Sequence, residues 1–108
     1  MKKYAMFIGR WQTWHTGHEW LINQQLNKGK NCWVAIRDVQ KDENNPKSAQ
    51  EVLQELQKEP FFTQNWDKIL LSIIPDIESV NYGRDAGYGV IFHEAPMDIA
   101  KIGGTQIG

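Results

Sequence analysis

The segment that most constrains the fold is a glycine-containing turn between an apolar run and a helix-like run near the start of the chain. The apolar run covers residues 4–8, the turn covers 9–18, and the helix-like run covers 19–27. A strand that enters a helix through such a turn leaves backbone N–H groups unpaired at the helix N-terminus, a place that favours phosphate. His15 and His18 add two imidazoles there. The turn therefore predicts a site that holds a polyphosphate.

The rest of the chain alternates between strand-like and helix-like patterns. Continuous apolar residues predict strands at 4–8, buried on both faces, at 32–36 and at 69–74, with a fourth strand near 88–92. A polar loop over 38–47 precedes a second helix, where Ser48 and Glu51 have capping-box spacing. The apolar face of this helix begins at Ala49 and the helix is ended by Pro60.

This alternation of strands and helices predicts an α/β fold, a Rossmann-like parallel sheet with helices on both faces, built as one domain over residues 1–108. Ligands of such sheets bind beyond the carboxyl ends of the strands, where the strand order reverses. Because residues 9–18 leave the carboxyl end of the first strand, the motif and the fold indicate the same crevice.

Composition excludes several classes of protein. The formal net charge is −1 and the basic residues are scattered, which disfavours nucleic acid as a partner. No apolar stretch is long enough to span a membrane, so we expect no membrane partner. The single cysteine, Cys32, cannot form an internal disulfide, which suits a cytoplasmic protein. His93 and Cys32 are too isolated to complete a zinc site, and no metal-ligating residues are expected.

Three ordered pieces of the chain resemble the HxGH nucleotidyltransferase superfamily. Residues 15–18 read HTGH, and the extended form GRWQTWHTGH at 9–18 is similar to GRFQPFHxGH of the nicotinamide-nucleotide adenylyltransferase branch. Residues 45–51 (NPKSAQE) resemble that branch's NPFTAEE helix start, and 102–107 (IGGTQI) resemble the second signature, ISxTxIR. The resemblance implies the nucleotidyltransferase and adenine nucleotide alpha-hydrolase-like fold over nearly the whole chain.

The resemblance also implies an activity. A phosphate oxygen of a small phosphorylated metabolite attacks the α-phosphorus of a nucleoside triphosphate, and pyrophosphate leaves. His15 and His18 would be the catalytic residues that hydrogen-bond the phosphate oxygens, which is a matter of positioning and charge stabilisation. Mg²⁺ would be carried mainly by the nucleotide phosphates, because no dedicated carboxylate cluster is visible.

The remaining candidate residues divide into two groups. The nucleotide-binding group comprises Gly9, Arg10, Trp11, Gly17 and Thr105. The substrate-binding group comprises Arg37 and Asp38 after the second strand and Arg84 in the glycine-rich segment 82–88. Trp11 and Trp14 are interpreted as pocket walls or core rather than as groups that stack on the base.

Two departures from the family pattern stand at the end of the chain. Gly108 replaces the arginine that ends the second signature, and Gly103 replaces its serine. The chain also stops where the family starts another helix. Either the domain is truncated at its C-terminus, or the triphosphate is held differently, with Arg10, Arg37 and Arg84 as the available substitutes.

These observations favour adenylyl transfer from ATP to nicotinamide mononucleotide. Cytidylyl transfer to an alcohol phosphate is the alternative within the same chemistry, and a degenerate relative that binds nucleotide without turnover is the non-enzymatic one. A missing C-terminal helix would leave an apolar face of the sheet or of its helices uncovered, so we also expect a homodimer.

Overall fold

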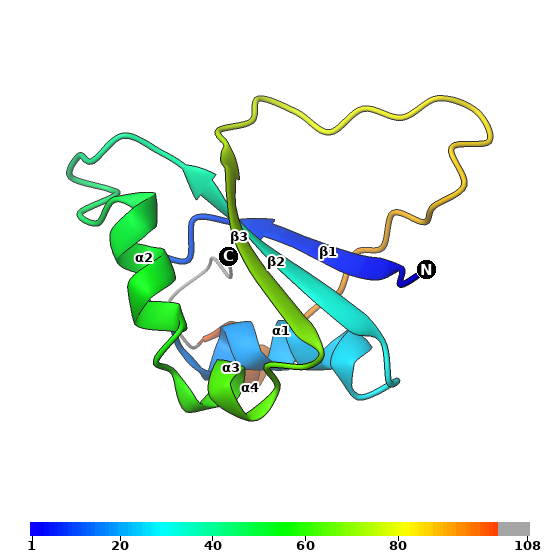
Figure 1. Cartoon of the computed structure of the whole chain (residues 1–108), viewed down its shortest axis with the longest axis horizontal. Coiled ribbons are helices and arrows are strands. Elements are labelled where there is room, and N and C mark those ends of the chain that lie inside the picture. Colours follow the sequence, from blue (N-terminus) through cyan, green and yellow to red (C-terminus); the bar gives the residue numbers. More distant parts are fainter. Residues whose placement is uncertain (102–108) are drawn as a thin grey trace.

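The computed structural model describes residues 1–101 as one layer of strands with helices packed against it (Figure 1). The elements follow in the order β1 (Tyr4–Gly9), α1 (Thr16–Leu26), β2 (Asn31–Asp38), α2 (Ala49–Leu56), α3 (Pro60–Gln64), β3 (Ile69–Pro75) and α4 (Met97–Ala100). The three strands are parallel. An α/β fold with a parallel sheet was predicted from the sequence, and it is confirmed.

The order of the strands is β1-β2-β3, with β2 in the centre. The register aligns Phe7 of β1 with Val34 of β2, and Val34 with Leu71 of β3. The order therefore does not reverse among the strands of residues 1–101. The expectation of a ligand crevice at a reversal point is wrong for this part of the chain, and β1 and β3 are both edge strands.

The hydrophobic core lies on one face of this sheet. Phe7 and Val34 pack there in one cluster with Ile22 of α1, Val52 of α2 and Phe62 of α3. The connection from β1 to β2 and the connection from β2 to β3 both move one strand along the sheet in the same direction. Because such crossover connections have the same hand, α1 and α2 lie on the same face of the sheet. The prediction of helices on both faces is wrong for the described helices. For the same reason β1 is not buried on both faces.

The helix boundaries follow from local chemistry. α1 begins at Thr16, three residues earlier than expected, because the His15 side chain caps it. Ser48 and Glu51 form the expected capping box of α2. Pro60 was expected to end a helix, but α2 already ends at Leu56 and Pro60 opens α3, where a proline has no N–H to lose.

The predicted fourth strand is not formed. Residues 76–96 contain no helix or strand, and Figure 1 shows this segment swinging out from the sheet before it returns past β1 to α4. Tyr88, Val90 and Phe92, which suggested the strand, have exposed fractions of 58%, 67% and 85%. An apolar run favours a strand only where a sheet edge pairs with it, and this segment crosses β1 without pairing.

Candidate functional site at the N-terminus of α1

Two stacked imidazoles form the start of α1. The His15 and His18 rings lie with their centroids 3.8 Å apart and their planes 16° from parallel. His15 has extended backbone, and its Nδ1 accepts a hydrogen bond of 3.1 Å from the Gly17 N–H. Because Nδ1 is the acceptor, the proton of neutral His15 lies on Nε2, which is then free to donate to a ligand.

His18 is held inside the protein by tryptophans. Its exposed fraction is 4%, and the Trp11 ring meets it edge-on with centroids 5.1 Å apart. The Trp14 ring is tilted by 31° against the His18 ring, with centroids 5.2 Å apart. The Nδ1 atom of His18 is buried and has no hydrogen-bond partner within residues 1–101. A buried polar atom without a partner costs about 1–3 kcal/mol, so this atom requires an explanation.

Burial also keeps both imidazoles neutral. Loss of solvent lowers the pKa of His15 from its ordinary value. Loss of solvent, and then the neighbouring His15, lower the pKa of His18 to about 4. The charged, doubly protonated form is unfavourable for both rings at once, because the two positive charges would repel at this separation. The pair is therefore neutral near pH 7 in the absence of an anion.

Trp11 fixes the turn between β1 and α1. Its exposed fraction is 1%, and its indole N–H donates to the Ala35 carbonyl of β2 at 2.9 Å. Its φ angle is 51°, a left-handed conformation that is strained for a bulky residue. Such strain persists only where the surroundings impose it, and it is frequent at functional sites. The interpretation of Trp11 and Trp14 as core or pocket wall is confirmed.

The first motif is bound to the segment that precedes α2. The Gln12 side chain donates to the Lys47 carbonyl and accepts from the Lys47 N–H, both at 2.9 Å. The Arg10 guanidinium donates to Asn45 Oδ1 at 3.2 Å. Asn45 is itself buried and held by Asp42. Two of the three family-like pieces, residues 9–18 and 45–51, are therefore in direct contact.

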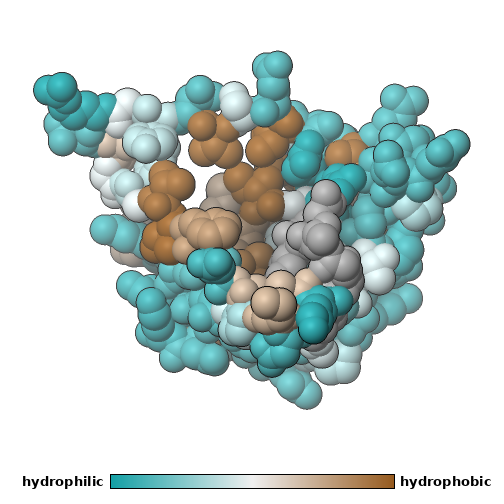
Figure 2. All heavy atoms as spheres, turned by 180° about the vertical axis from the view of Figure 1, so that it is seen from behind, coloured by the Kyte–Doolittle hydropathy of each residue, from teal (hydrophilic) through white to brown (hydrophobic). Residues whose placement is uncertain are grey.

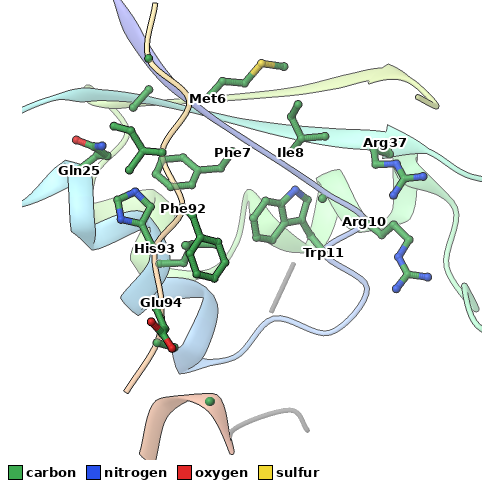
Figure 3. A pocket seen from close by; sticks show the side chains of 17 residues that line it. Met6, Phe7, Ile8, Arg10, Trp11, Gln25, Arg37, Phe92, His93 and Glu94 are labelled. Atoms are coloured by element: carbon green, nitrogen blue, oxygen red, sulfur yellow. The ribbon is translucent and has the colours of Figure 1, made fainter. Parts of the chain in front are cut away.

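A cavity of about 860 Å³ lies beside the free edge of β1 (Figure 3). Arg10 and Arg37 project at one end of it, while Phe92, His93 and Glu94 come from the segment that crosses β1. Gly9 and Trp11 also line the cavity. Seen from behind, apolar side chains surround a hollow in the molecular surface (Figure 2). His15 and His18 do not line this cavity, but Trp11 lines it and its ring also meets the His18 ring.

The structure brings only some of the predicted site residues together. His15, Gly17 and His18 share the first turn of α1, and the N–H of Gly17 is already used in the cap. Gly9, Arg10, Trp11 and Arg37 line the neighbouring cavity. These two groups meet at Trp11, so seven of the predicted positions form one continuous region around the carboxyl end of β1.

The other predicted residues lie elsewhere. Arg84 is exposed in the 76–96 segment and does not line the cavity. Asp38 is exposed, and Arg37 forms an ion pair with Asp76, with Nη2 and Oδ1 2.8 Å apart. Thr105 lies outside the described residues. The binding roles given to these residues stay predictions.

Sequence reasoning gave no role to Gln12, Asn45 or His93. Gln12 and Asn45 stood inside the family-like pieces, and their spacing from residue 15 and residue 51 was the available signal. His93, whose ring stacks on Phe7 with centroids 6.5 Å apart, carried no such signal. Its contact comes from the path of the 76–96 segment, which local patterning does not determine.

No protein-family model, no curated protein sequence and no solved structure matches this chain. Within residues 1–101 no helix is long and apolar enough to cross a bilayer. The same residues contain no group of three or more histidine, cysteine, aspartate or glutamate side chains placed to hold a metal ion. The geometry of the α1 site therefore carries the functional argument.

Proposed function

We propose that this protein is a nucleotidyltransferase that transfers an adenylyl group from ATP to nicotinamide mononucleotide. The observation that carries the proposal is the buried His18, whose Nδ1 has no partner in the described chain and whose ring stacks on the helix-capping His15. An ordinary core histidine would have such a buried ring nitrogen bonded to protein or to an ordered water. An imidazole left unpartnered at a helix N-terminus suits a ligand that brings its own oxygen atoms.

The electrostatics of the pair support an anionic ligand. Both histidines have lowered pKa values because burial disfavours their charged forms. Phosphate oxygens at the ring nitrogens would reverse this balance and favour the protonated form. Binding of a triphosphate would therefore draw one proton into the pair, and the resulting charge would lie beside the phosphates as charge moves to the leaving group.

The reaction requires no covalent intermediate with the protein. A phosphate oxygen of nicotinamide mononucleotide forms a bond to the α-phosphorus of ATP, and the bond from this phosphorus to the bridging oxygen breaks. Pyrophosphate leaves with the electron pair of that bond. His15 and His18 hold the oxygens whose charge increases, while Arg10 and Arg37 line the cavity on the other side of Trp11 and suit the acceptor phosphate. Mg²⁺ would arrive on the nucleotide, because residues 1–101 offer no carboxylate cluster for it.

The test uses two replacements of His18 that separate its packing from its nitrogen atoms. His18→Phe keeps an aromatic ring against Trp11 and Trp14 and removes the unpartnered Nδ1. His18→Ala removes both. Pyrophosphate release from ATP with nicotinamide mononucleotide should fall by roughly 10²-fold or more in both variants, the usual cost of losing one preorganised donor.

The two variants should differ in stability although they share the loss of turnover. His18→Phe should unfold at the same or a higher temperature than the wild type, whereas His18→Ala should unfold at a lower one because it leaves a cavity. Wild-type turnover in His18→Phe would remove the imidazole from the mechanism. ATP binding by the wild type without pyrophosphate release from any acceptor would replace the proposal with a nucleotide-binding protein. Tenfold tighter binding of CTP than of ATP would replace adenylyl with cytidylyl transfer.

A further inference from the structure

The sheet has a second face that no described helix covers. The register places Met6, Trp33 and Leu70 in one row across the three strands on this side, and Ile8 and Ser72 in the next. None of these residues belongs to the core cluster that the helices cover. Met6 and Leu70 have exposed fractions of 42% and 43%, and Tyr4 has 42%. We call this surface, defined by Tyr4, Met6, Ile8, Trp33, Leu70 and Ser72, the open sheet face.

The polar groups at the centre of the open sheet face are already satisfied. The Trp33 indole N–H donates to Ser72 Oγ at 2.7 Å, which joins β2 to β3 on this side. Removing water from the face would therefore leave neither the indole N–H nor the hydroxyl oxygen without a hydrogen-bond partner. A face with exposed apolar side chains and an internally bonded polar pair is suited to burial against another apolar surface.

Charges lie at the two ends of the strands rather than on the open sheet face itself. A lysine precedes each strand directly, namely Lys3, Lys30 and Lys68. Asp67 is the one acidic residue next to them in sequence. At the opposite edge Arg37 and Asp76 neutralise each other as an ion pair, and Arg10 keeps its charge because its partner Asn45 is neutral. Asp38 is exposed and has no ion-pair partner among residues 1–101. The amino edge is thus net positive, whereas the carboxyl edge has no net charge, and Asp38 is its carboxylate outside an ion pair.

We propose that the open sheet face binds a second copy of this chain, with the strands of the two copies antiparallel. The two-fold axis would lie between the sheets and perpendicular to the strands, so each amino edge would cover the carboxyl edge of the other copy. Lys30 of one copy would then approach Asp38 of the other. A parallel arrangement would instead bring three lysines against three lysines, which like-charge repulsion disfavours. Aligned sheets of this kind pack about 10 Å apart, the depth of two layers of side chains.

This inference does not rest on the proposed function, because the histidines of the α1 site are absent from the open sheet face. Met6 and Ile8 of this face also line the cavity beside β1, whereas Leu70 does not. The first experiment is light scattering across the micromolar range on the wild type, Met6→Lys and Leu70→Lys. The wild type should show twice the monomer mass of 12.5 kDa, and both variants should be monomers. Trp66→Lys is the matched control, since Trp66 is 78% exposed but is not on this face, and it should remain a dimer. A monomeric wild type at high micromolar concentration would overturn the proposal, as would dimeric Met6→Lys and Leu70→Lys.

A charge exchange tests the orientation of the two copies. Lys30→Glu and Asp38→Lys should each weaken the dimer by up to about fivefold, the range of exposed ion pairs. The double variant, which restores opposite charges between the copies, should recover wild-type affinity. If each single variant leaves the affinity unchanged, or if the double variant is weaker than either, the antiparallel arrangement is wrong.

Discussion

Residues 9–18 and residues 82–88 are both polar, glycine-containing turns, but only the first is held in place by distant parts of the chain. The first is fixed by contacts with distant parts of the chain: Trp11 bonds to β2, and Gln12 bonds twice to Lys47. The second lies in an exposed segment, where the rings of Tyr82 and Tyr88 contact each other within the turn. The difference shows that glycine and polar residues permit a binding turn, but that long-range partners are what hold its geometry.

The largest expected effect tests this contrast through stability. Trp11→Ala removes a side chain that is almost fully buried and bonded to Ala35, and it should lower the free energy of unfolding by about 3–5 kcal/mol. Tyr88→Ala should change it by less than about 0.5 kcal/mol, because Tyr88 is largely exposed. Urea denaturation of both variants measures the difference. Equal losses would mean that the two turns are held alike.

Acid should weaken the first turn through His18. The ordinary histidine pKa is 6.5, and burial lowers that of folded His18 to about 4. Between these values the unfolded chain takes up a proton that folded His18 does not, so stability falls as the pH is lowered from about 6.5 to 4. The loss from this residue is at most about 3 kcal/mol.

His18→Phe is the control for the effect of acid, because it keeps the ring and removes the titration. Thermal unfolding of both proteins at several pH values gives the comparison. The variant should lose less stability than the wild type between pH 6.5 and 4. Parallel curves would show that His18 titrates normally and is not buried as described.

A smaller effect separates the bonds of the first turn from those of the exposed segment. Gln12→Ala breaks both bonds to Lys47 and leaves a half-buried N–H and carbonyl without these partners, so it should cost about 2 kcal/mol. Asn81→Ala breaks one exposed bond to Ser79 and should cost less than about 0.5 kcal/mol. Chemical denaturation resolves the two values. A similar cost for both would remove the role given to the contact between residues 12 and 47.

The sequence predicted the parts of the fold that depend on neighbouring residues. The three parallel strands, the capping box at Ser48 and Glu51, and the helix after the histidine turn were all predicted from periodicity and local spacing. The single-sided covering of the sheet and the path of the 76–96 segment were not. Both features depend on which strands pair with one another. Residues 88–92 have the same apolar pattern whether or not they pair with the edge of a sheet.

For the candidate site, the sequence likewise indicated residues but not how they pack. The motif located His15, Gly17 and His18, but the stacking of the two rings and the unpartnered Nδ1 follow from the packing of Trp11 and Trp14 around them. The contact between Arg10 and Asn45 joins residues 35 positions apart, and spacing along the chain gives no measure of such a distance in space.

The most direct test of the account is the pKa of His18 with and without ATP, followed by NMR of the imidazole nitrogens. In the free protein burial should hold this pKa at about 4. If the stacked pair binds phosphate, saturating ATP with Mg²⁺ should raise the pKa of His18 by at least one unit, because phosphate oxygens favour the charged ring. A His18 pKa that stays the same at saturating ATP, or a protein that binds no ATP, would contradict the claim that the N-terminus of α1 is a nucleotide site.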